Sequence, residues 1–302
     1  MEDQKGRINR LTTVLVGELF KAFGFNSKGL ITKTLSTFVY KPIKNFAEIC
    51  IGFDQRVVRS GFQAAAQWIM PNFAHDMHVD VLEKIPTTGP LIICSNHPGA
   101  YDSLVIASNL PRDDIKIVVN IPLDFINEVP ATLSHFLYAP NDPFVRMSVV
   151  RSAIKHLKSG GALLVFASGR IDPDPTTMIG AEDEISRWSR SLELMLRSVP
   201  ETKLLITIVS NILHVKYVNH AFTKFQKERP DKQRISEFMQ VIHQIRTKGA
   251  MEHIPRMTIS KPFNLDELCN SELDFNIMNG IKDKGRKLLA YHLQGKLVEI
   301  NL

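Results

Sequence analysis

From residue 79 onward, short apolar runs of strand length alternate with longer segments that carry apolar residues at helical spacing. The runs at 91–94 and 204–209 are almost wholly apolar, which is typical of strands buried on both faces. Strands that alternate with helices form mostly parallel sheets covered by helices. The sequence therefore predicts an α/β fold with a mostly parallel, mixed sheet. Its further strands are expected at 79–82, 115–119, 162–166 and 257–259.

The first 73 residues follow a different pattern, because their apolar residues recur every three or four positions. This spacing predicts one helix that stops near Gly24 and a second over 30–40 that ends before Pro42. A third helix is expected over 45–70, closed by Pro71. We therefore predict two domains, a helical N-terminal domain at 1–73 and an α/β domain at 74–302.

A histidine and an aspartate follow the first buried run at a spacing of five residues, with Pro98 and Gly99 between them. We expect a strand, a turn that carries His97, and a helix over 100–110 whose first turn carries Asp102. At this spacing the carboxylate can reach the imidazole, fix its tautomer and stabilise its charged form, as a general base requires. The alternative is that His97 only caps the helix and Asp102 is an ordinary first-turn acid.

The position of this pair in the predicted sheet also indicates a functional site. In open α/β sheets ligands bind beyond the carboxyl ends of the strands. The loops at that edge should therefore converge around His97 and Asp102. These loops follow Cys94, Val119, Phe166 and Val209.

Charge and composition narrow the possible partners. A formal net charge of +6 and a pI near 9.2 favour an anionic membrane surface, a phosphorylated substrate or an acidic carrier protein. The chain has no zinc-finger spacing and no long Lys/Arg run, so we expect no nucleic-acid partner. Three scattered cysteines fit neither a disulfide framework nor a metal site. We expect a cytoplasmic protein, or one held peripherally on a membrane by the basic and apolar residues of 1–44.

Two motifs resemble those of a known family. The segment N-H-P-G-A-Y-D at 96–102 resembles the H-x4-D block of the glycerolipid acyltransferases, which include glycerol-3-phosphate and lysophosphatidate acyltransferases. The segment F-A-S-G-R-I-D-P-D-P at 166–175 resembles their third block, usually close to F-P-E-G-T-R-S. It is still more similar to the S-G-G-R-D-R-P-D-P run of the plastid-type enzymes, which also carry an N-terminal helical domain. The resemblance extends over residues 79–265.

The resemblance implies an O-acyltransferase of phospholipid biosynthesis. His97 would take a proton from an acceptor hydroxyl, oriented by Asp102, while acyl-CoA or acyl carrier protein donates a fatty acyl group as a thioester. No cofactor and no metal would be needed. The backbone amides of Gly99 and Ala100 are candidate oxyanion donors, because amides at a helix N-terminus lack partners within the helix.

Four residues are candidates for binding the substrate. Arg170 suits bidentate recognition of a phosphate, with a salt bridge to Asp172 or Asp174 as the alternative. Gly169 permits a close approach or a positive φ, and Ser168 stands beside it in the loop. Tyr101 contacts substrate or packs in the core.

The third block departs from the family pattern at two positions. Ser168 replaces the usual glutamate, and Asp172 stands where the plastid-type pattern has a second arginine. The pattern that binds the acceptor's phosphate is therefore incomplete, which favours an alcohol that is less charged or larger than glycerol 3-phosphate.

Two other functions fit parts of the sequence. A non-catalytic lipid- or acyl-binding relative would explain the missing glutamate, although such a protein has no need for the His/Asp pair. A metallophosphoesterase would use the D-x-H pattern at 76–78. That class also requires a G-D-x-x-D segment and a late G-H-x-H pair, and the chain has neither.

Overall fold

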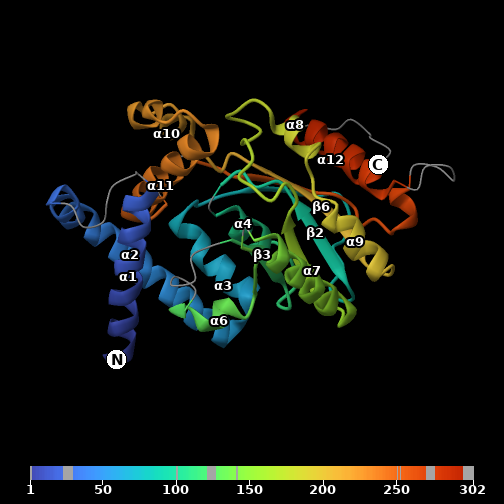
Figure 1. Cartoon of the computed structure of the whole chain (residues 1–302), viewed down its shortest axis with the longest axis horizontal. Helices are drawn as coiled ribbons and strands as arrows, with labels where there is room; N and C mark the ends of the chain where they lie inside the picture. The colour runs from blue at the N-terminus through green and yellow to red at the C-terminus, as the bar shows by residue number, and fades with distance from the viewer. Residues whose placement is uncertain are drawn as a thin grey trace. The chain divides into compact units, whose positions relative to one another are not determined.

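A computed structural model of the 302-residue chain provides the structure. Its described residues form two compact units, each made of three separate segments (Figure 1). The helical unit consists of Met1–Asp76, Ile121–Ser134 and Leu213–His253. The sheet unit consists of Met77–Asn120, His135–Ile212 and Ile254–Leu302. The structure describes residues 2–22, 30–99, 101–120, 127–140, 142–249, 251, 253–269 and 276–294.

The sheet unit is built on a seven-stranded sheet within the described residues, in the order β1-β7-β6-β2-β5-β3-β4. Neighbouring strands run parallel except β6 and β7, which are antiparallel. The predicted α/β class with a mostly parallel, mixed sheet is therefore confirmed. The strands are β1 (His78–Val81), β2 (Leu91–Ser95), β3 (Lys116–Val119), β4 (Phe136–Tyr138), β5 (Ala162–Phe166), β6 (Lys203–Ser210) and β7 (Arg256–Ile259).

Strand β2 lies between β5 and β6 and is buried along its whole length, which explains its unbroken apolar sequence. Its last residue, Ser95, pairs with Phe166 of β5 and Thr207 of β6. All three strands are parallel, so their carboxyl ends reach the same edge of the sheet. This register brings the loops after β2, β5 and β6 together.

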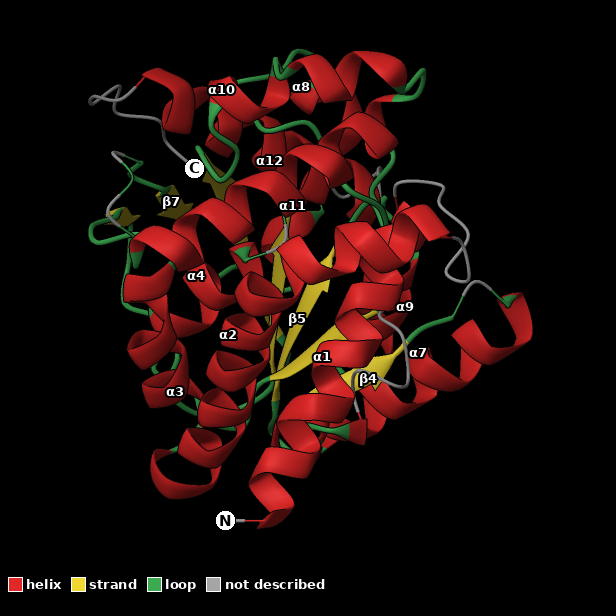
Figure 2. Ribbon diagram, turned by 90° about the vertical axis from the view of Figure 1, so that its left-hand side faces the viewer, coloured by secondary structure: helices red, strands yellow, loops and turns green. Residues whose placement is uncertain are grey.

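Helices of the same unit pack their apolar side chains against the sheet. Helix α7 runs alongside β5 and β4 (Figure 2), and α9 and α12 complete one large apolar core. Burying each leucine or isoleucine of this core stabilises the fold by about 1.5–3 kcal/mol. The elements are α4 (Asp102–Ser108), α7 (Pro143–Lys158), α8 (Ala181–Ile185), α9 (Ser191–Ser198), η3 (Asp266–Leu268) and α12 (Ile277–Gln294).

In the helical unit, α1 and α2 lie side by side and bury a small apolar core between them. None of the helices in the described ranges combines the length and the apolarity that a membrane crossing demands. The elements are α1 (Glu2–Ala22), α2 (Leu30–Ser60), α3 (Phe62–Ile69), η1 (Met70–Asn72), α6 (Pro130–Leu133), α10 (Val215–Val218), η2 (Ala221–Phe225) and α11 (Arg229–Thr247).

The predicted helix boundaries near Pro42 are wrong. Helix α2 continues through this proline. The proline costs the helix one backbone donor, but the burial of Ile43, Ala47 and Ile51 in the following turns outweighs that cost. The break falls instead at Gly61, whose φ of 86° is a left-handed conformation that glycine adopts without strain. The predicted stop at Gly24 lies outside the described residues.

Two more features differ from what the sequence predicts. The pattern of residues 181–197 predicts one helix, but the structure divides it into α8 and α9, because the Ser189 amide donates to the carbonyl of Ala167 instead of continuing a helix. The prolines after β3 predict an irregular stretch, but this stretch contains α6 and β4. Both are too short for periodicity to reveal.

The compact units differ from the predicted domains in their continuity. Segments 121–134 and 213–253, expected in the α/β domain, group with the N-terminal helices. Independent folding is a separate property, so the division at residues 73 and 74 stays a prediction about domains.

Candidate active site

The site begins where β2 ends, at a side chain that extends the sheet. Asn96 is buried, and its Nδ2 donates to the carbonyl of Val209 at 2.8 Å, while its Oδ1 accepts from the Val209 amide at 2.8 Å. This side chain thus reproduces the hydrogen bonds of one more strand residue and fixes the start of the loop to β6. Sequence reasoning missed this role, which only the register of β2 and β6 reveals.

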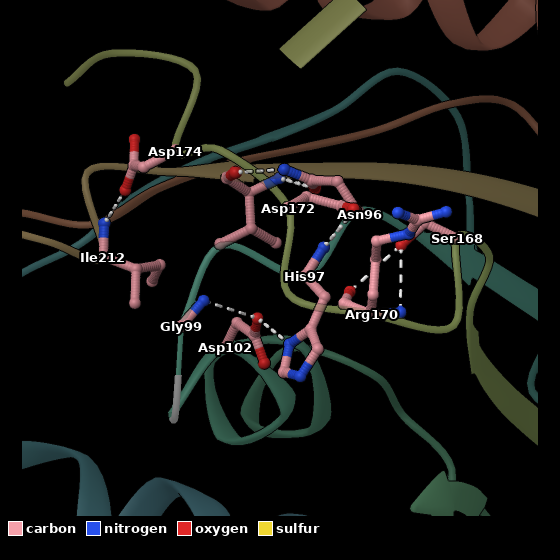
Figure 3. A network of polar contacts seen from close by, with 10 residues as sticks. Asn96, His97, Gly99, Asp102, Ser168, Arg170, Asp172, Asp174 and Ile212 are labelled. Carbon is pink, nitrogen blue, oxygen red and sulfur yellow. Dashed lines mark hydrogen bonds and ion pairs between the residues drawn. The ribbon is translucent and has the colours of Figure 1, made fainter. Parts of the chain in front are cut away.

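The structure brings His97 and Asp102 together as the spacing predicts (Figure 3). Nδ1 of His97 lies 2.7 Å from Oδ2 of Asp102, and the carboxylate is 1% exposed. A carboxylate accepts, so Nδ1 carries the proton and Nε2 is the basic nitrogen. The His97 side chain keeps 27% of its surface exposed, so the ring is open to a substrate. The pair has the geometry that general base catalysis needs.

A ring from β5 fixes the orientation of the imidazole further. Phe166 stacks on His97 with the ring centroids 4.1 Å apart and the planes 20° from parallel. Because Phe166 ends β5 and His97 follows β2, this contact depends on the parallel register of the two strands. The ring is thus held at Nδ1 and across its face.

Asp172 binds the backbone of the histidine at both of its polar groups. Its Oδ2 accepts from the His97 amide at 2.9 Å, and its own amide donates to the His97 carbonyl at 2.7 Å. Burial raises the pKa of this carboxyl to about 6, although hydrogen bonds from Ser168 and His97 oppose the shift. Asp172 therefore positions His97, a role that the sequence did not suggest.

Asp174 joins the same loop to the end of β6. Its Oδ2 accepts from the Ile212 amide at 2.7 Å, and its Oδ1 accepts from the Asn211 amide at 2.9 Å. The Tyr101 hydroxyl donates to the Ile212 carbonyl at 3.1 Å, and Tyr101 is 2% exposed. The structure thus favours the packing alternative for Tyr101.

The other substrate-binding candidates lie in the loop after β5. Gly169 has a φ of 68°, which confirms the predicted positive φ. The Ser168 hydroxyl donates to the Arg170 carbonyl at 3.0 Å and accepts from the Arg170 amide at 3.3 Å, so it shapes the turn. The Arg170 side chain is half exposed, and its Nε lies 3.9 Å from Oε2 of Glu184. The alternative prediction of a salt bridge to Asp172 or Asp174 is therefore wrong, because the carboxylate beside Arg170 is that of Glu184.

The loops after β2, β5 and β6 therefore converge as expected. The loop after Val119 continues into residues outside the described part of the chain. Within the described ranges, no group of three or more His, Cys, Asp or Glu side chains is arranged to hold a metal ion.

Comparison with known proteins bears on these motifs. Residues 76–183, which include the H-x4-D and third blocks, match the family model described as Acyltransferase. This segment belongs to the acyltransferase family. Over 95% of each chain, the structure is similar to the crystal structure of the 1-acyl-sn-glycerophosphate (LPA) acyltransferase PlsC from Thermotoga maritima, with 14% identity and a TM-score of 0.41. No curated protein sequence matches the chain.

Glu184 introduces a carboxylate beside the arginine of the acyltransferase third block. It lies in α8, is 5% exposed and also accepts from Arg187 at 2.9 Å. The family's usual glutamate is absent at Ser168, and Glu184 brings a negative charge to Arg170 from the following helix. No sequence signal pointed to it, because the pairing depends on how α8 packs.

The oxyanion donors expected from the acyltransferase pattern are not both available. The Gly99 amide donates to Oδ2 of Asp102 at 3.1 Å, so it is already engaged within the protein (Figure 3). Ala100 lies outside the described residues. The Gly99 amide instead helps Asp102 to hold the turn in place.

Proposed function

We propose that this chain is an O-acyltransferase that moves a fatty acyl group from a thioester to a hydroxyl of a glycerolipid-type acceptor. The observation that carries the proposal is the 2.7 Å contact between His97 and Asp102 at the carboxyl end of β2, within a segment of the acyltransferase family. The donor is acyl-CoA or acyl carrier protein, which acts as a co-substrate, and the reaction needs no cofactor. The basic net charge suits both donors and an anionic membrane surface.

The chemistry follows from the proton positions. Nε2 of His97 takes the proton of the acceptor hydroxyl as its oxygen attacks the thioester carbonyl carbon, and Asp102 stabilises the imidazolium that forms. The tetrahedral intermediate then collapses, the carbon–sulfur bond breaks, and the leaving thiolate takes the proton from Nε2. The products are an ester and a free thiol.

The surroundings of the pair support an acceptor that carries an anionic group. Arg170 follows β5, whose Phe166 stacks on His97, and its guanidinium suits a phosphate. Asp172, which replaces a second arginine, binds the His97 backbone instead of a substrate. A single arginine in the third block favours an acceptor that binds through fewer charge contacts than glycerol 3-phosphate.

Replacement of His97 tests the proposal. The protein is incubated with labelled acyl-CoA or acyl carrier protein and a panel of lipid acceptors, and products are identified by mass. We expect His97→Ala to lower turnover by about 10²- to 10⁴-fold, the usual contribution of a general base. His75→Ala, at an exposed histidine, is the matched control and should keep wild-type turnover.

Two outcomes would contradict the proposal. Undiminished turnover by a folded His97→Ala variant would exclude the mechanism. A wild-type protein that binds acyl chains or lipids without turnover on any acceptor would instead support the non-catalytic alternative.

A further inference from the structure

Two phenylalanines in the helical unit face solvent. Phe222 is 60% exposed and Phe225 is 81% exposed, and both belong to η2. Single apolar residues on a surface are common, but two large aromatic rings on a five-residue element are costly to leave in water. Val215, 50% exposed, precedes them in α10.

The protein holds this segment in a defined conformation. Thr223, which stands between the two phenylalanines in the sequence, is buried, and its Oγ1 donates to the Val218 carbonyl at 2.9 Å and the His220 carbonyl at 2.6 Å. Nδ1 of His220 accepts from the Phe222 amide at 3.3 Å. These hydrogen bonds lie within residues 218–223 and fix the conformation of the turn, so the fold itself holds both rings in exposed positions.

Two buried polar residues of α11 fasten the same segment. Ser236 donates to the Tyr217 carbonyl at 3.1 Å, and the Gln240 Oε1 accepts from the His214 amide at 2.8 Å. Helix α11 therefore supports the segment from beneath, and the exposed rings have a rigid base.

The charged side chains of the segment itself are all positive, and an exposed acid, Glu228, follows it directly. Residues 213–227 contain Lys216, Lys224 and Lys227, all exposed, and no aspartate or glutamate. Lysine side chains can lie along apolar material while their ammonium groups reach phosphates. Exposed aromatic rings among lysines fit the boundary between lipid headgroups and acyl chains.

We propose that residues 215–227, the docking segment, bind the surface of a bilayer that contains anionic lipid. Phe222 and Phe225 enter the headgroup boundary, and the three lysines contact lipid phosphates. A protein partner would need a hollow shaped to both rings, whereas a bilayer accepts projecting rings without one. The proposal rests on this surface alone, so it holds or fails independently of acyl transfer and of residues 1–44.

Vesicle binding by the full chain tests the docking segment. Co-sedimentation is measured with vesicles of equal parts phosphatidylcholine and phosphatidylglycerol, and with phosphatidylcholine alone. Phe222→Ser with Phe225→Ser should lower the partition coefficient roughly 100-fold, about tenfold for each ring. Lys224→Glu with Lys227→Glu should lower it roughly fivefold or more for each lysine, and only on the anionic vesicles.

Matched variants separate docking from general surface properties. Ile179→Ser removes an apolar side chain that is 96% exposed but lies just before the acidic residues 182–184. This variant should bind the vesicles like wild type. Lys155→Glu with Lys158→Glu makes the same charge change on α7 and should have a much smaller effect. Circular dichroism establishes that every variant is folded.

A second measurement reports ring insertion directly. Phe225→Trp should give emission that lipids brominated in their acyl chains quench, beyond the signal of Trp68 and Trp188 in wild type. Wild-type partitioning by the folded double-serine variant, or absence of quenching, would overturn the proposal. The proposal would also be overturned if the double-serine variant differed from wild type only by losing self-association in sedimentation without lipid. That result would mean that the rings bind a second copy of the chain.

Discussion

His97 is held by the protein through its backbone and its ring. Asp172 binds its amide and carbonyl, Asp102 binds Nδ1, and Phe166 covers one face of the imidazole. A general base loses much of its effect when it moves by even an ångström, because the reacting atoms must already lie in line. The contacts around His97 therefore fix its backbone and ring more firmly than a helix cap requires, as the proposed role of general base demands.

Asp172 should make stability depend on pH. Its folded pKa of about 6 lies above the ordinary value of 3.8, so its contribution is fully present below about pH 3.8 and is lost as pH rises through 6. Asp172→Asn keeps an acceptor for the His97 amide and removes the buried charge. From pH 4.5 to 7.5 the stability of this variant should therefore rise relative to wild type, by about 2 kcal/mol.

Urea unfolding at the two pH values measures this difference. Asp266→Asn, at an exposed aspartate, is the control and should leave the pH dependence unchanged. An Asp172→Asn variant whose stability relative to wild type is equal at both pH values would show that the buried carboxyl does not titrate between them.

Arg170 and Glu184 should act together on the acceptor. If the guanidinium binds an anionic group of the acceptor, Arg170→Ala should raise the acceptor KM roughly tenfold and leave the donor KM nearly unchanged, as loss of one exposed charge-assisted contact predicts. Glu184→Gln should shift the acceptor KM in the same direction by less, because Arg170 remains but loses its orienting charge. Steady-state kinetics with each substrate varied in turn separates the two effects.

Arg197→Ala provides the matched control, because this exposed arginine pairs with Glu193 on α9, outside the third block. Its acceptor KM should equal that of wild type. If Arg170→Ala left the acceptor KM unchanged, Arg170 would not bind the acceptor, and its contact with Glu184 would be purely structural.

Among the helices and strands, the sequence predicts best the strands that are buried on both faces of the sheet. Strand β5 was predicted at its observed bounds, because a strand between two others carries an unbroken apolar run. The passage of α2 through Pro42 escaped prediction, since packing of the following turns outweighs one lost hydrogen bond. In the site, local spacing was enough for His97 and Asp102. It was not enough for Glu184, whose contact depends on packing.

Helix α12 offers a test of close packing. A Cβ on Gly280 would overlap the carbonyl oxygen of Leu268, so Gly280→Ala must push the helix away from η3. We expect a loss of about 3 kcal/mol in the free energy of unfolding, as for other overpacked cores. Gly17 in α1 has nothing within 4 Å of the same position, so Gly17→Ala should stabilise by about 1 kcal/mol through helix propensity.

Urea unfolding of both variants gives the comparison, with opposite signs expected for the same chemical change. A Gly280→Ala protein as stable as wild type would mean that α12 and η3 can separate at little cost.

At the scale of the whole molecule, the helical unit depends on contacts between distant segments. Asp54 of α2 binds Arg7 of α1 at 2.8 Å and accepts from the Thr132 amide of α6 at 2.8 Å, so one buried carboxylate joins three helices from two segments. Gln244 of α11 donates to the Phe73 carbonyl at 2.7 Å. The bonds that reach Thr132 and Gln244 are buried, so removal of the N-terminal helices would leave buried polar groups without partners.

These contacts predict that the chain cannot be divided at the end of its N-terminal helices. A fragment of residues 77–302 would keep segments 121–134 and 213–253 but lose the helices that bury them. Thr132 and Gln244 would lose their partners, and the side of α11 that contacts α1 and α2 would be exposed. We expect this fragment to unfold at a lower temperature and over a broader range than the full chain, measured by calorimetry and circular dichroism.

Asp54→Ala in the full chain removes only the contacts of one carboxylate, so it should lower the midpoint temperature of unfolding by less. A fragment that unfolds as sharply as the full chain, at the same temperature, would instead support an independent α/β domain after residue 73.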